Sequence, residues 1–484
     1  MALSTSPSAV SLLSASSVLS SDSERETPGS TPNTGSENGD AAPFGPEGVT
    51  MATTIDKLRR QLPLPAKDGF ILVTGGLGYI GSHTALELMK EGYNVIVVDN
   101  LSNSFASTRW RIQHLAAQHC KAQGRSTPQL HFHRLDYQNT PMMRLVLEQY
   151  CAWPYGNHFA KEPDAICSQT LLGSSHGDGS DSAQLNSASP CSRSQISGVI
   201  HFAAYKSVEE SISNPLGYYD NNVCGFVGFI GLLAEFDIRS FIFSSSATVY
   251  GSKANAEKPL REDDVIHRAG YCSEKHAVVE PSVEGLTCTY ARTKYFCEAI
   301  LADVARADPQ WRIVALRYFN PVGCDPSGLL GETPRTKPTN LFPIIGEVLR
   351  GARPALSVFG QDWPTRDGTA IRDYIHVADI ARGHVAALAG GYNRDWAGAG
   401  EAFRTYNLGS GTGTSVLEIV NSLEEAAQRP VPIEWTGRRA GDVGFCIAST
   451  TRAKEELGWQ PRETIAQSAR DLWNHTQKWH RIEE

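Results

Sequence analysis

Three side chains in the middle of the chain could together take the proton of an alcohol. Tyr290 and Lys294 lie four positions apart, so they face the same way on a helix. Ser246 closes a serine run, Ser244–Ser246, that follows an apolar segment. A phenol, an ammonium and a hydroxyl form an acid/base set, which can remove an alcohol proton while a hydride leaves the same carbon. These residue types therefore predict redox chemistry at a carbinol carbon.

The spacing of Tyr290 and Lys294 has a second interpretation, because Tyr-x-x-x-Lys arises by chance in long chains and marks many solvated helix faces. The phenol also has an unperturbed pKa of about 10, so lowering it to about 7 requires roughly 4 kcal/mol in favour of the phenolate. A neighbouring ammonium and a positively charged nicotinamide ring could supply this energy in a cleft with little water. We therefore expect Lys294 to lower the pKa of Tyr290 and to hold the nicotinamide ribose.

A glycine motif upstream predicts the site of that nicotinamide cofactor. Gly75, Gly78 and Gly81 follow the apolar run 70–74 and open a predicted helix. Glycines let the backbone turn tightly beside a pyrophosphate, and a helix N-terminus favours its negative charge. Asp99 ends the next apolar run, where a carboxylate can bind both hydroxyls of the adenine ribose and repel a 2′-phosphate. The motif predicts a dinucleotide site that prefers NAD to NADP; in the alternative interpretation Asp99 only caps a turn.

The elements that position these residues alternate between strands and helices. A strand, a helix and a second strand within about 30 residues form a βαβ unit, which implies a parallel sheet. The predicted fold class is therefore α/β, a Rossmann-type doubly wound parallel sheet with a smaller C-terminal α/β domain. Apolar strands are predicted at 70–74, 93–99, 130–135, 198–202, 240–244 and 312–318, with the first helix over 82–91.

Changes in composition divide the chain into three parts. Residues 1–66 are rich in Ser, Pro and Gly and are predicted to be a disordered extension, within which Met51 is an alternative start. Residues 67–319 are predicted to form the NAD-binding domain, and residues 320–484 mainly the substrate-binding domain. Two stretches interrupt the alternation: a polar insertion at 156–195, predicted to be disordered, and a second insertion at 253–286, whose state stays open.

The bulk composition excludes several classes of partner. The formal net charge of −8 provides no electrostatic footprint for nucleic acid or an anionic membrane surface. No apolar run is long enough to span a bilayer. The ten cysteines include no Cys-x-x-Cys, which predicts no metal site and no disulfide framework, and fits reduced thiols in the cytoplasm. Residues 1–50 contain one basic residue, Arg25, and so match neither a secretory signal nor a mitochondrial presequence.

Eight motifs, in this order, make the chain resemble the UDP-glucose 4-epimerase (UDP-galactose 4-epimerase) family of extended short-chain dehydrogenases/reductases. The resemblance runs from about Phe70 to Arg481, apart from the two insertions. The motifs that carry it lie at 73–83, 99–104, 201–208, 218–223, 243–251, 317–323, 372–377 and 406–411.

The resemblance implies a role for each matching residue. Tyr290 is the implied base at the sugar 4-hydroxyl, Lys294 its electrostatic partner, and Ser246 the relay hydroxyl. The implied NAD-binding residues are Gly75, Gly78, Tyr79, Ile80, Gly81, Asp99, Asn100, Asn103, Ser104, Asp136, Tyr137, Phe202, Ala203, Ala204, Lys206, Asn221, Ser244, Tyr290, Lys294, Tyr318 and Phe319. The implied UDP-sugar-binding residues are Ser246, Tyr290, Asn320, Asn340, Leu341, Ser357, Phe359, Arg372, Tyr374, Arg439, Asp442 and Cys446. Arginines suit a diphosphate, which favours fixed, forked donors.

The activity implied is reversible epimerisation at C4 of UDP-glucose and UDP-galactose in galactose metabolism, by a homodimer. It proceeds through a 4-keto sugar, with transient hydride transfer to tightly bound NAD. Cys446 occupies a position where the family carries either a bulky tyrosine or a small residue. A small side chain leaves room for a 2-acetamido group, so UDP-GalNAc and UDP-GlcNAc are also expected substrates. Thr289 and Ala291 replace the family's usual Pro and Gly, so the backbone beside the second insertion is expected to be rerouted.

Three alternative functions share parts of this pattern. A nucleotide-sugar dehydratase needs an acid/base pair, usually Asp-Glu, directly after the serine strand, and Ala247 and Thr248 occupy those positions. A pentose-specific 4-epimerase would use the same chemistry on a sugar that lacks C6. A non-catalytic NAD-sensing regulator on this fold typically loses the tyrosine or the lysine, and both are present here.

Overall fold

The computed structural model describes residues 69–152, 193–256, 258–265, 267, 270–272, 277–279, 285–335, 337–390, 402–439 and 442–483. The predicted extension at 1–66 lies outside these residues, as does the first insertion apart from its last three residues.

Seven parallel strands form the central sheet, as the βαβ pattern predicts. Six of them closely match strands predicted from the sequence. The seventh, β14, pairs with β10 at the edge, so residues after 320 complete this sheet, whereas the predicted boundary at 319 assigns them to the second domain. In spatial order the strands are β14 (Phe403–Leu408), β10 (Arg312–Tyr318), β7 (Ser240–Ser246), β6 (Ile196–His201), β1 (Phe70–Thr74), β2 (Asn94–Asp99) and β3 (Leu130–Arg134).

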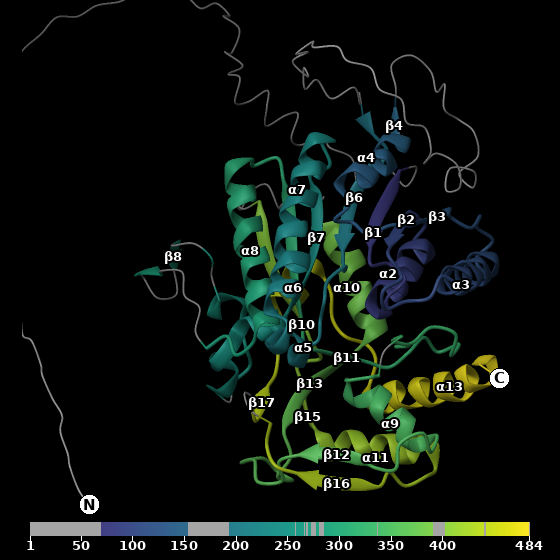
Figure 1. Ribbon diagram of the computed structural model, residues 1–484, viewed down its shortest axis with the longest axis vertical. Coiled ribbons are helices and arrows are strands. Elements are labelled where there is room, and N and C mark those ends of the chain that lie inside the picture. The colour runs from purple at the N-terminus through teal and green to yellow at the C-terminus, as the bar shows by residue number, and fades with distance from the viewer. Residues whose placement is uncertain are drawn as a thin grey trace, which may run out of the picture. The chain divides into compact units, whose positions relative to one another are not determined.

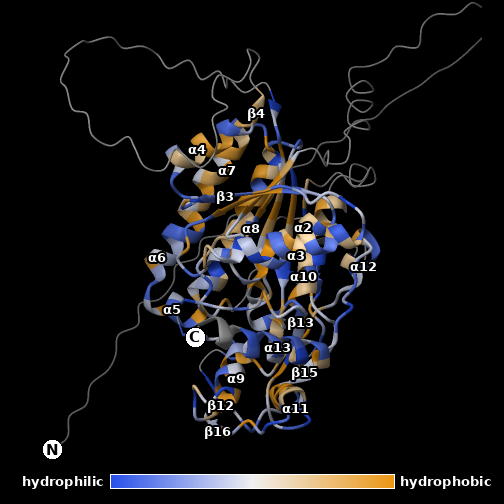
Figure 2. Cartoon of the chain, turned by 90° about the vertical axis from the view of Figure 1, so that its right-hand side faces the viewer, coloured by the Kyte–Doolittle hydropathy of each residue, from blue (hydrophilic) through white to orange (hydrophobic). Residues whose placement is uncertain are grey.

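Helices cover both faces of this sheet because its strands are apolar on both sides. Side chains alternate between the faces along a strand. Ile71 and Val73 pack with α2, α3 and α10, whereas Phe70 and Leu72 pack with α4, α7 and α8. Figure 2 shows the apolar strands between the helices. The helices are α2 (Tyr79–Lys90), α3 (Thr108–Ala122), α10 (Val377–Gly390) and α12 (Thr451–Leu457), and α4 (Thr140–Gln149), α7 (Gly225–Glu235) and α8 (Thr289–Ala307).

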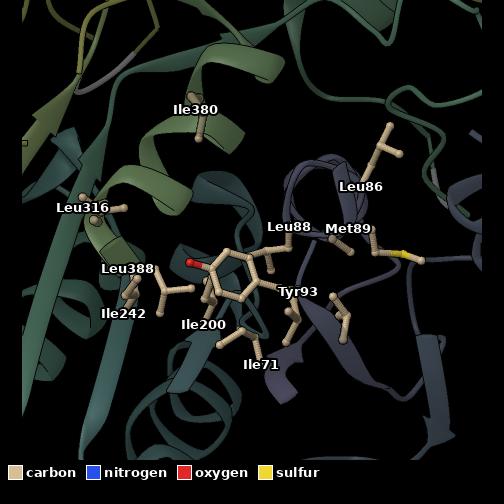
Figure 3. Packing of buried hydrophobic residues seen from close by; sticks show 14 of the residues in the cluster. Ile71, Leu86, Leu88, Met89, Tyr93, Ile200, Ile242, Leu316, Ile380 and Leu388 are labelled. Atoms are coloured by element: carbon tan, nitrogen blue, oxygen red, sulfur yellow. The ribbon is translucent and has the colours of Figure 1, made fainter. Parts of the chain in front are cut away.

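The core on the α2 side is sealed by residues from distant parts of the chain. Tyr93 lies among Ile71, Leu88 and Leu388, which come from β1, α2 and α10 (Figure 3). These side chains are almost completely buried. Full burial of a side chain of this size contributes roughly 1.5–3 kcal/mol, so α10 is fixed against the sheet although it comes from the C-terminal part.

A second group of short strands and helices follows β10 and occupies the lower part of Figure 1. It has its own apolar core, to which α9, α11 and α13 contribute. This arrangement is the smaller α/β part that the sequence predicts. One sheet joins β11 (Asn320–Val322), β13 (Ile371–His376), β15 (Gly413–Ser415) and β17 (Phe445–Cys446), while β12 (Leu356–Phe359) pairs with β16 (Ile433–Thr436); the helices are α9 (Leu341–Leu349), α11 (Val416–Ala427) and α13 (Ile465–Glu483).

The described part of the second insertion is attached to the core. Leu260 bridges to Ala448, directly after β17, and its backbone N–H donates to the Ile447 carbonyl at 2.8 Å. Leu260 also shares an apolar cluster with Phe319 and Cys446. The elements here are the 3-10 segments η2 (Ala247–Ala256) and η3 (Glu262–Asp264) and the hairpin of β8 (Gly270–Cys272) and β9 (Ala277–Val279). At the first insertion, β4 (Cys151–Ala152) precedes it and pairs with β5 (Arg193–Ser194) at its end.

A π-helix interrupts the helical stretch before α7. Helix α5 (Val208–Ser213) is followed by α6 (Pro215–Tyr219), which continues into the π-helix η1 (Asp220–Cys224) and then into α7. Such one-turn π segments are frequent at functional sites.

The cysteines depart from the prediction at one position. Six are free in the described part of the chain, namely Cys120, Cys224, Cys288, Cys297, Cys324 and Cys446. Cys151 is disulfide-bonded, so the prediction of reduced thiols throughout is wrong there. No described helix combines the length and the apolar character that crossing a bilayer requires.

Candidate active site

A cavity of about 380 Å³ opens where the strands β1, β2, β6, β7 and β10 end. In a parallel sheet this is the edge at which ligands bind. The structure brings most of the predicted site residues to this cavity, although their roles stay predictions. These are Gly75, Gly78, Tyr79, Ile80, Gly81, Asp99, Asn100, Asn103, Ser104, Tyr137, Phe202, Ala203, Ala204, Lys206, Asn221, Ser244, Ser246, Tyr290, Lys294, Tyr318, Phe319, Asn320 and Asn340.

The glycine turn fits the pyrophosphate of a dinucleotide. Gly75 has a φ of +69°, and a Cβ there would lie 2.8 Å from the Ala203 nitrogen. A Cβ on Gly81 would lie 2.3 Å from the Gly75 carbonyl oxygen. Helix α2 begins directly after Gly78, with no side-chain cap and no acidic residue in its first turn. The first turn of the helix therefore contributes N–H groups to the cavity rim and no acidic side chain of its own.

Asp99 combines the two interpretations given to it from the sequence. Its carboxylate accepts hydrogen bonds from Leu77 N at 3.0 Å, Leu101 N at 2.9 Å and the Ser104 hydroxyl at 2.8 Å. It therefore does cap turns, and it also lines the cavity while only 8% exposed. The backbone bonds fix the carboxylate where it can accept from the hydroxyls of a ribose. This position suits NAD, because a 2′-phosphate would meet the same negative charge.

The serine run at the end of β7 divides between the two faces of the strand. Phe241 and Phe243 point toward α8, and Ser245 follows the same alternation, with its hydroxyl donating to the Glu298 carboxylate on α8. Ser244 and Ser246 therefore point to the other face. The Ser246 hydroxyl is hydrogen-bonded to Tyr290, and it also accepts from the Thr248 hydroxyl at 3.1 Å.

Lys294 is held next to this run. Its Nζ donates to the Ser244 carbonyl at 2.6 Å and lies 6.0 Å from the centroid of the Tyr290 ring. Burial lowers the pKa of Lys294 to about 8, although the nearby Cys297 and Glu298 act in the opposite direction. The pKa of Lys294 therefore lies close to physiological pH.

The prediction that Lys294 and a bound nicotinamide ring together lower the pKa of Tyr290 stays a prediction, but in the protein alone the pKa is raised. Burial raises the pKa of Tyr290 to about 12; the hydrogen bond with Ser246 opposes this rise, while Cys288 adds to it. Reaching a pKa of about 7 from there requires roughly 7 kcal/mol. Burial prevails because Lys294 is directed at the Ser244 carbonyl instead of the phenol.

The π-helix places two asparagines beside the cavity. Asn221 accepts at its Oδ1 from Gln138 at 2.6 Å, and its Nδ2 donates to Asn222 at 2.8 Å. Asn222 in turn donates to the Tyr205 carbonyl at 3.0 Å and to the Thr293 hydroxyl at 3.1 Å. Asn222 thus connects η1 to α8, the helix of Tyr290 and Lys294, and the sequence contains no signal for this role.

Some of the residues predicted to bind the UDP-sugar form a second group outside the lining of the cavity. Arg372 on β13 pairs with Asp442 at 2.5 Å, and Arg439 lies 3.8 Å from the same carboxylate. The Arg439 guanidinium stacks over the Phe359 ring at 4.2 Å, with its side chain 62% exposed. Cys446 on β17 pairs with Arg372 in register. Two guanidinium groups on one carboxylate leave one positive charge for a diphosphate.

Four further predicted residues join neither group as closely. Asp136 does not line the cavity, and it accepts from Asn100 Nδ2 at 2.9 Å. Tyr374 is buried beside Phe342 and pairs in register with Asn320 of β11. Leu341 begins α9 and Ser357 lies on β12, and neither lines the cavity.

Several cavity residues were missed from the sequence. The loop after Leu330 contributes Glu332, whose carboxylate accepts from Lys206 Nζ and Asn340 Nδ2, each at 2.7 Å. This carboxylate joins a residue predicted to contact NAD to one predicted to contact UDP. Thr248 could have been found from its position two residues after Ser246, but nothing local marks Glu332. The other missed lining residues include Leu77, Thr108, Arg111, Tyr205, Thr333 and Pro334.

Two family descriptions match the chain. Residues 154–409 match the NAD dependent epimerase/dehydratase family. Residues 72–152 match the description of GDP-mannose 4,6 dehydratase.

The chain is also similar to proteins with assigned names. It is 39% identical over 404 residues to UDP-glucose 4-epimerase 2 of Arabidopsis thaliana, covering 84% of this chain and 94% of the relative. It is 37% identical over 408 residues to the bifunctional UDP-glucose 4-epimerase and UDP-xylose 4-epimerase 3 of the same plant, covering 84% and 95%. A UDP-glucose 4-epimerase from Bifidobacterium longum, solved with NAD⁺ and UDP, superposes with a TM-score of 0.65 at 35% identity, covering 84% of this chain and 98% of that one.

Proposed function

The chain belongs to the UDP-glucose 4-epimerases of the NAD-dependent epimerase/dehydratase family, and on this premise we propose how its site works. It is an NAD-dependent isomerase that interconverts UDP-glucose and UDP-galactose by inverting C4 of the sugar. The observation that carries the proposal is the meeting of Tyr290, Lys294 and Ser246 in one cavity with the glycine turn and Asp99.

NAD⁺ would be held by the glycine turn and Asp99 and would supply a reversible hydride acceptor for C4 of the sugar. Tyr290 takes the O4 proton in the first half of the cycle and gives it back in the second. Ser246, hydrogen-bonded to Tyr290, steadies the phenol oxygen during this transfer. A positive charge from the cofactor, added to that of Lys294, favours the phenolate and offsets the burial that raises the pKa of Tyr290.

We propose that binding energy is concentrated on the UDP group, so that the sugar can turn between the two hydride transfers. Arg372, Arg439 and Asp442 lie beyond the cavity that holds Tyr290, which supports this division. The pyrophosphate would use the forked donors of the arginines, while the sugar is held loosely next to Tyr290.

The decisive experiment is a substrate panel on purified protein without added NAD. UDP-galactose is expected to convert to UDP-glucose with no accumulation of NADH, because each hydride returns to the sugar. Stoichiometric NADH would overturn the isomerase mechanism and indicate a dehydrogenase. A Tyr290→Phe variant that folds and retains bound NAD provides the control for contaminating epimerase.

We also propose that N-acetylated UDP-sugars are substrates. Cys446 is 9% exposed and lies in register with Arg372, so its small side chain borders the predicted sugar pocket. Cys446→Tyr is expected to abolish turnover of UDP-GalNAc while conserving most turnover of UDP-galactose. Wild-type protein that is inactive on UDP-GalNAc but active on UDP-galactose would refute this part of the proposal.

A pentose substrate is a second candidate, favoured by the similarity to the bifunctional plant enzyme that also carries a UDP-xylose 4-epimerase name. UDP-xylose therefore belongs in the same panel. Conversion at a rate comparable with UDP-galactose would support a bifunctional enzyme, whereas no conversion would restrict it to hexoses.

We propose, finally, that the protein is a cytoplasmic homodimer acting in galactose metabolism. Exposed apolar side chains gather on α5, α6, α7 and α8, including Ile212, Leu216, Val227 and Phe296. Helices α6 and α8 adjoin each other through the rings of Tyr219 and Phe296. Sedimentation of the wild type against Leu216→Asp tests the dimer, and a monomeric wild type would refute it. Six described cysteines are free, which supports a reducing compartment, whereas the disulfide at Cys151 does not.

A further inference from the structure

Helix α8 carries a third functional candidate on the face that holds Tyr290 and Lys294. Glu298 follows Lys294 by four positions, and its side chain is completely buried. Its carboxylate accepts from the Ser245 hydroxyl, from Arg317 Nε at 3.1 Å and Nη2 at 2.8 Å, and from His267 Nε2 at 2.7 Å. Burial alone would raise the pKa of Glu298, but the charge of Arg317 and the donated hydrogen bonds hold it below its ordinary value. The group is therefore a carboxylate that can only accept.

His267 comes from the second insertion, outside the sheet and its covering helices. Its side chain is 4% exposed, and its ring lies 4.8 Å from the Tyr295 ring and 6.1 Å from the Phe403 ring. Because Glu298 only accepts, the His267 Nε2 must carry a proton. The Nδ1 of His267 is buried without a hydrogen-bond partner among the described residues. The polar contact that orients this ring in the described structure is thus the one with Glu298.

The hydrogen bond from Ser245 connects Glu298 to the reacting groups. Ser245 lies between Ser244, whose carbonyl holds Lys294, and Ser246, which is hydrogen-bonded to Tyr290. A shift of the Glu298 carboxylate therefore moves the end of β7 and both neighbouring serines. Misplacement of a catalytic group by about 1 Å can cost on the order of a hundredfold in rate.

Arg317 alone does not determine where the carboxylate sits. Its guanidinium is completely buried and is shared with the Tyr250 hydroxyl at 3.2 Å, the Glu262 carbonyl at 2.9 Å and the Val265 carbonyl at 3.0 Å. The carbonyls of Glu262 and Val265 belong to the same insertion as His267. His267 thus supplies the fourth hydrogen bond to Glu298: it donates to Oε2, while Ser245 donates to Oε1.

We propose that His267 is a positioning residue for the epimerase reaction: it fixes Glu298 so that Ser245 holds Ser244 and Ser246 in place beside Lys294 and Tyr290. The inference rests on the proposed function and adds that the second insertion is part of the catalytic machinery. Removing the imidazole leaves Glu298 Oε2 with one donor fewer in a site that water does not reach, so the carboxylate turns away from Ser245.

The test compares His267→Leu, which has no donor, with His267→Gln, whose amide can still donate. Turnover of UDP-galactose by His267→Leu is expected to fall roughly tenfold in kcat, with KM within about twofold, and His267→Gln should recover most of the loss. In a Ser246→Ala background the Leu substitution should lower kcat by clearly less than tenfold, because one of the two groups that it displaces is already absent. The matched control is His133→Leu. His133 lies on β3, is also partly buried, and is hydrogen-bonded to the Tyr150 hydroxyl at 3.0 Å, so kcat of this variant should stay at the wild-type value.

Three results would overturn the inference. One is a His267→Leu variant with wild-type kcat. Another is an equal loss in the Leu and Gln variants with a lowered Tm, which would indicate a packing role. The third is an undiminished tenfold effect in the Ser246→Ala background. If His267→Leu does not fold, His267→Asn takes its place, because its shorter amide retains polarity but cannot reach Glu298. A wild type inactive on UDP-galactose would instead refute the proposed function itself.

Discussion

The two walls of the site are built in different ways. On the cofactor wall, the Asp99 carboxylate is 8% exposed and accepts three hydrogen bonds. The donors are Leu101 N and the Ser104 hydroxyl, which follow it within five residues, and Leu77 N in the glycine turn. On the substrate wall, Arg439 is 62% exposed and reaches Phe359 and Asp442 only through its own long side chain.

The difference suits two ligands with different residence times. A site whose donors and acceptors are fixed before binding loses little conformational entropy when the ligand enters, which favours retention. A wall of long, exposed side chains must be ordered each time, and this suits a substrate exchanged in every turnover. The contrast therefore supports the proposal that NAD stays bound while UDP-sugars come and go.

The largest effect is expected at Tyr290, which is predicted to contact both the cofactor and the sugar. Tyr290→Phe removes the proton acceptor but keeps the ring, so kcat should fall roughly a thousandfold while bound NAD and Tm stay unchanged. The comparison is Tyr295→Phe on the same helix, measured with UDP-galactose, which should retain activity. A folded Tyr290→Phe variant with full activity would remove this residue from the mechanism.

On the cofactor wall, Asp99→Ala should weaken NAD retention. The variant loses the acceptor for the ribose and leaves the N–H groups of Leu77 and Leu101 without their partner. Loss of a charged hydrogen-bonding group of this kind predicts roughly 30-fold weaker NAD binding. NAD content after gel filtration and fluorescence titration of the stripped protein measure the change, and unaltered retention would break the contrast between the walls.

On the substrate wall, Arg439→Ala should act on KM and leave NAD content unchanged. The guanidinium is exposed, so its removal costs one charge-assisted contact with the diphosphate and leaves no buried group unpaired. We expect KM for UDP-galactose to rise about tenfold with kcat within about threefold. Arg438→Ala, which removes the neighbouring arginine paired with Asp362 at 2.8 Å, serves as the matched control.

The lowered pKa of Lys294 predicts that activity falls and stability rises as the pH increases. Its pKa is lowered to about 8 from an ordinary 10.5, so kcat/KM of the enzyme should decline as pH rises through about 8 and the ammonium is lost. The unfolded chain binds more protons at this site between about pH 8 and 10.5, so this residue makes unfolding less favourable as pH rises through that window. Rate profiles and denaturant melts measure the two; a Lys294→Met variant should lose this contribution to the stability slope.

The smallest effect is expected at the start of helix α8. Cys288 is the N-cap, and its sulfur accepts from Ala291 N at 3.5 Å. A serine oxygen is a better acceptor at this position, so Cys288→Ser should stabilise the fold by about 0.5–1 kcal/mol with kcat within about twofold. Urea unfolding provides the measurement, and Cys120→Ser, which places a hydroxyl in the core, should be destabilised instead.

The parts predicted from the sequence are those built from neighbouring residues. The run 70–74, the glycines after it and Asp99 lie in one βαβ unit, so periodicity and turn chemistry were enough to place them. Glu332 binds Lys206 and His267 binds Glu298, each more than 30 positions away, and their own surroundings contain no pattern that marks these partners. The raised pKa of Tyr290 could not be predicted either, because it depends on burial and on where the Lys294 side chain points.

The π-helix η1 imposes a constraint on how the length of this chain can vary. An α-helix advances by about 100° per residue, so a one-residue deletion within Asp220–Cys224 would rotate α7 by about that angle relative to α6. Either Phe226 would leave the core or Asn221 would leave the cavity, since both cannot keep their directions. Insertions of tens of residues interrupt the chain elsewhere. Here the deletion of a single codon should make it impossible for the cofactor contact and the core packing to be kept together.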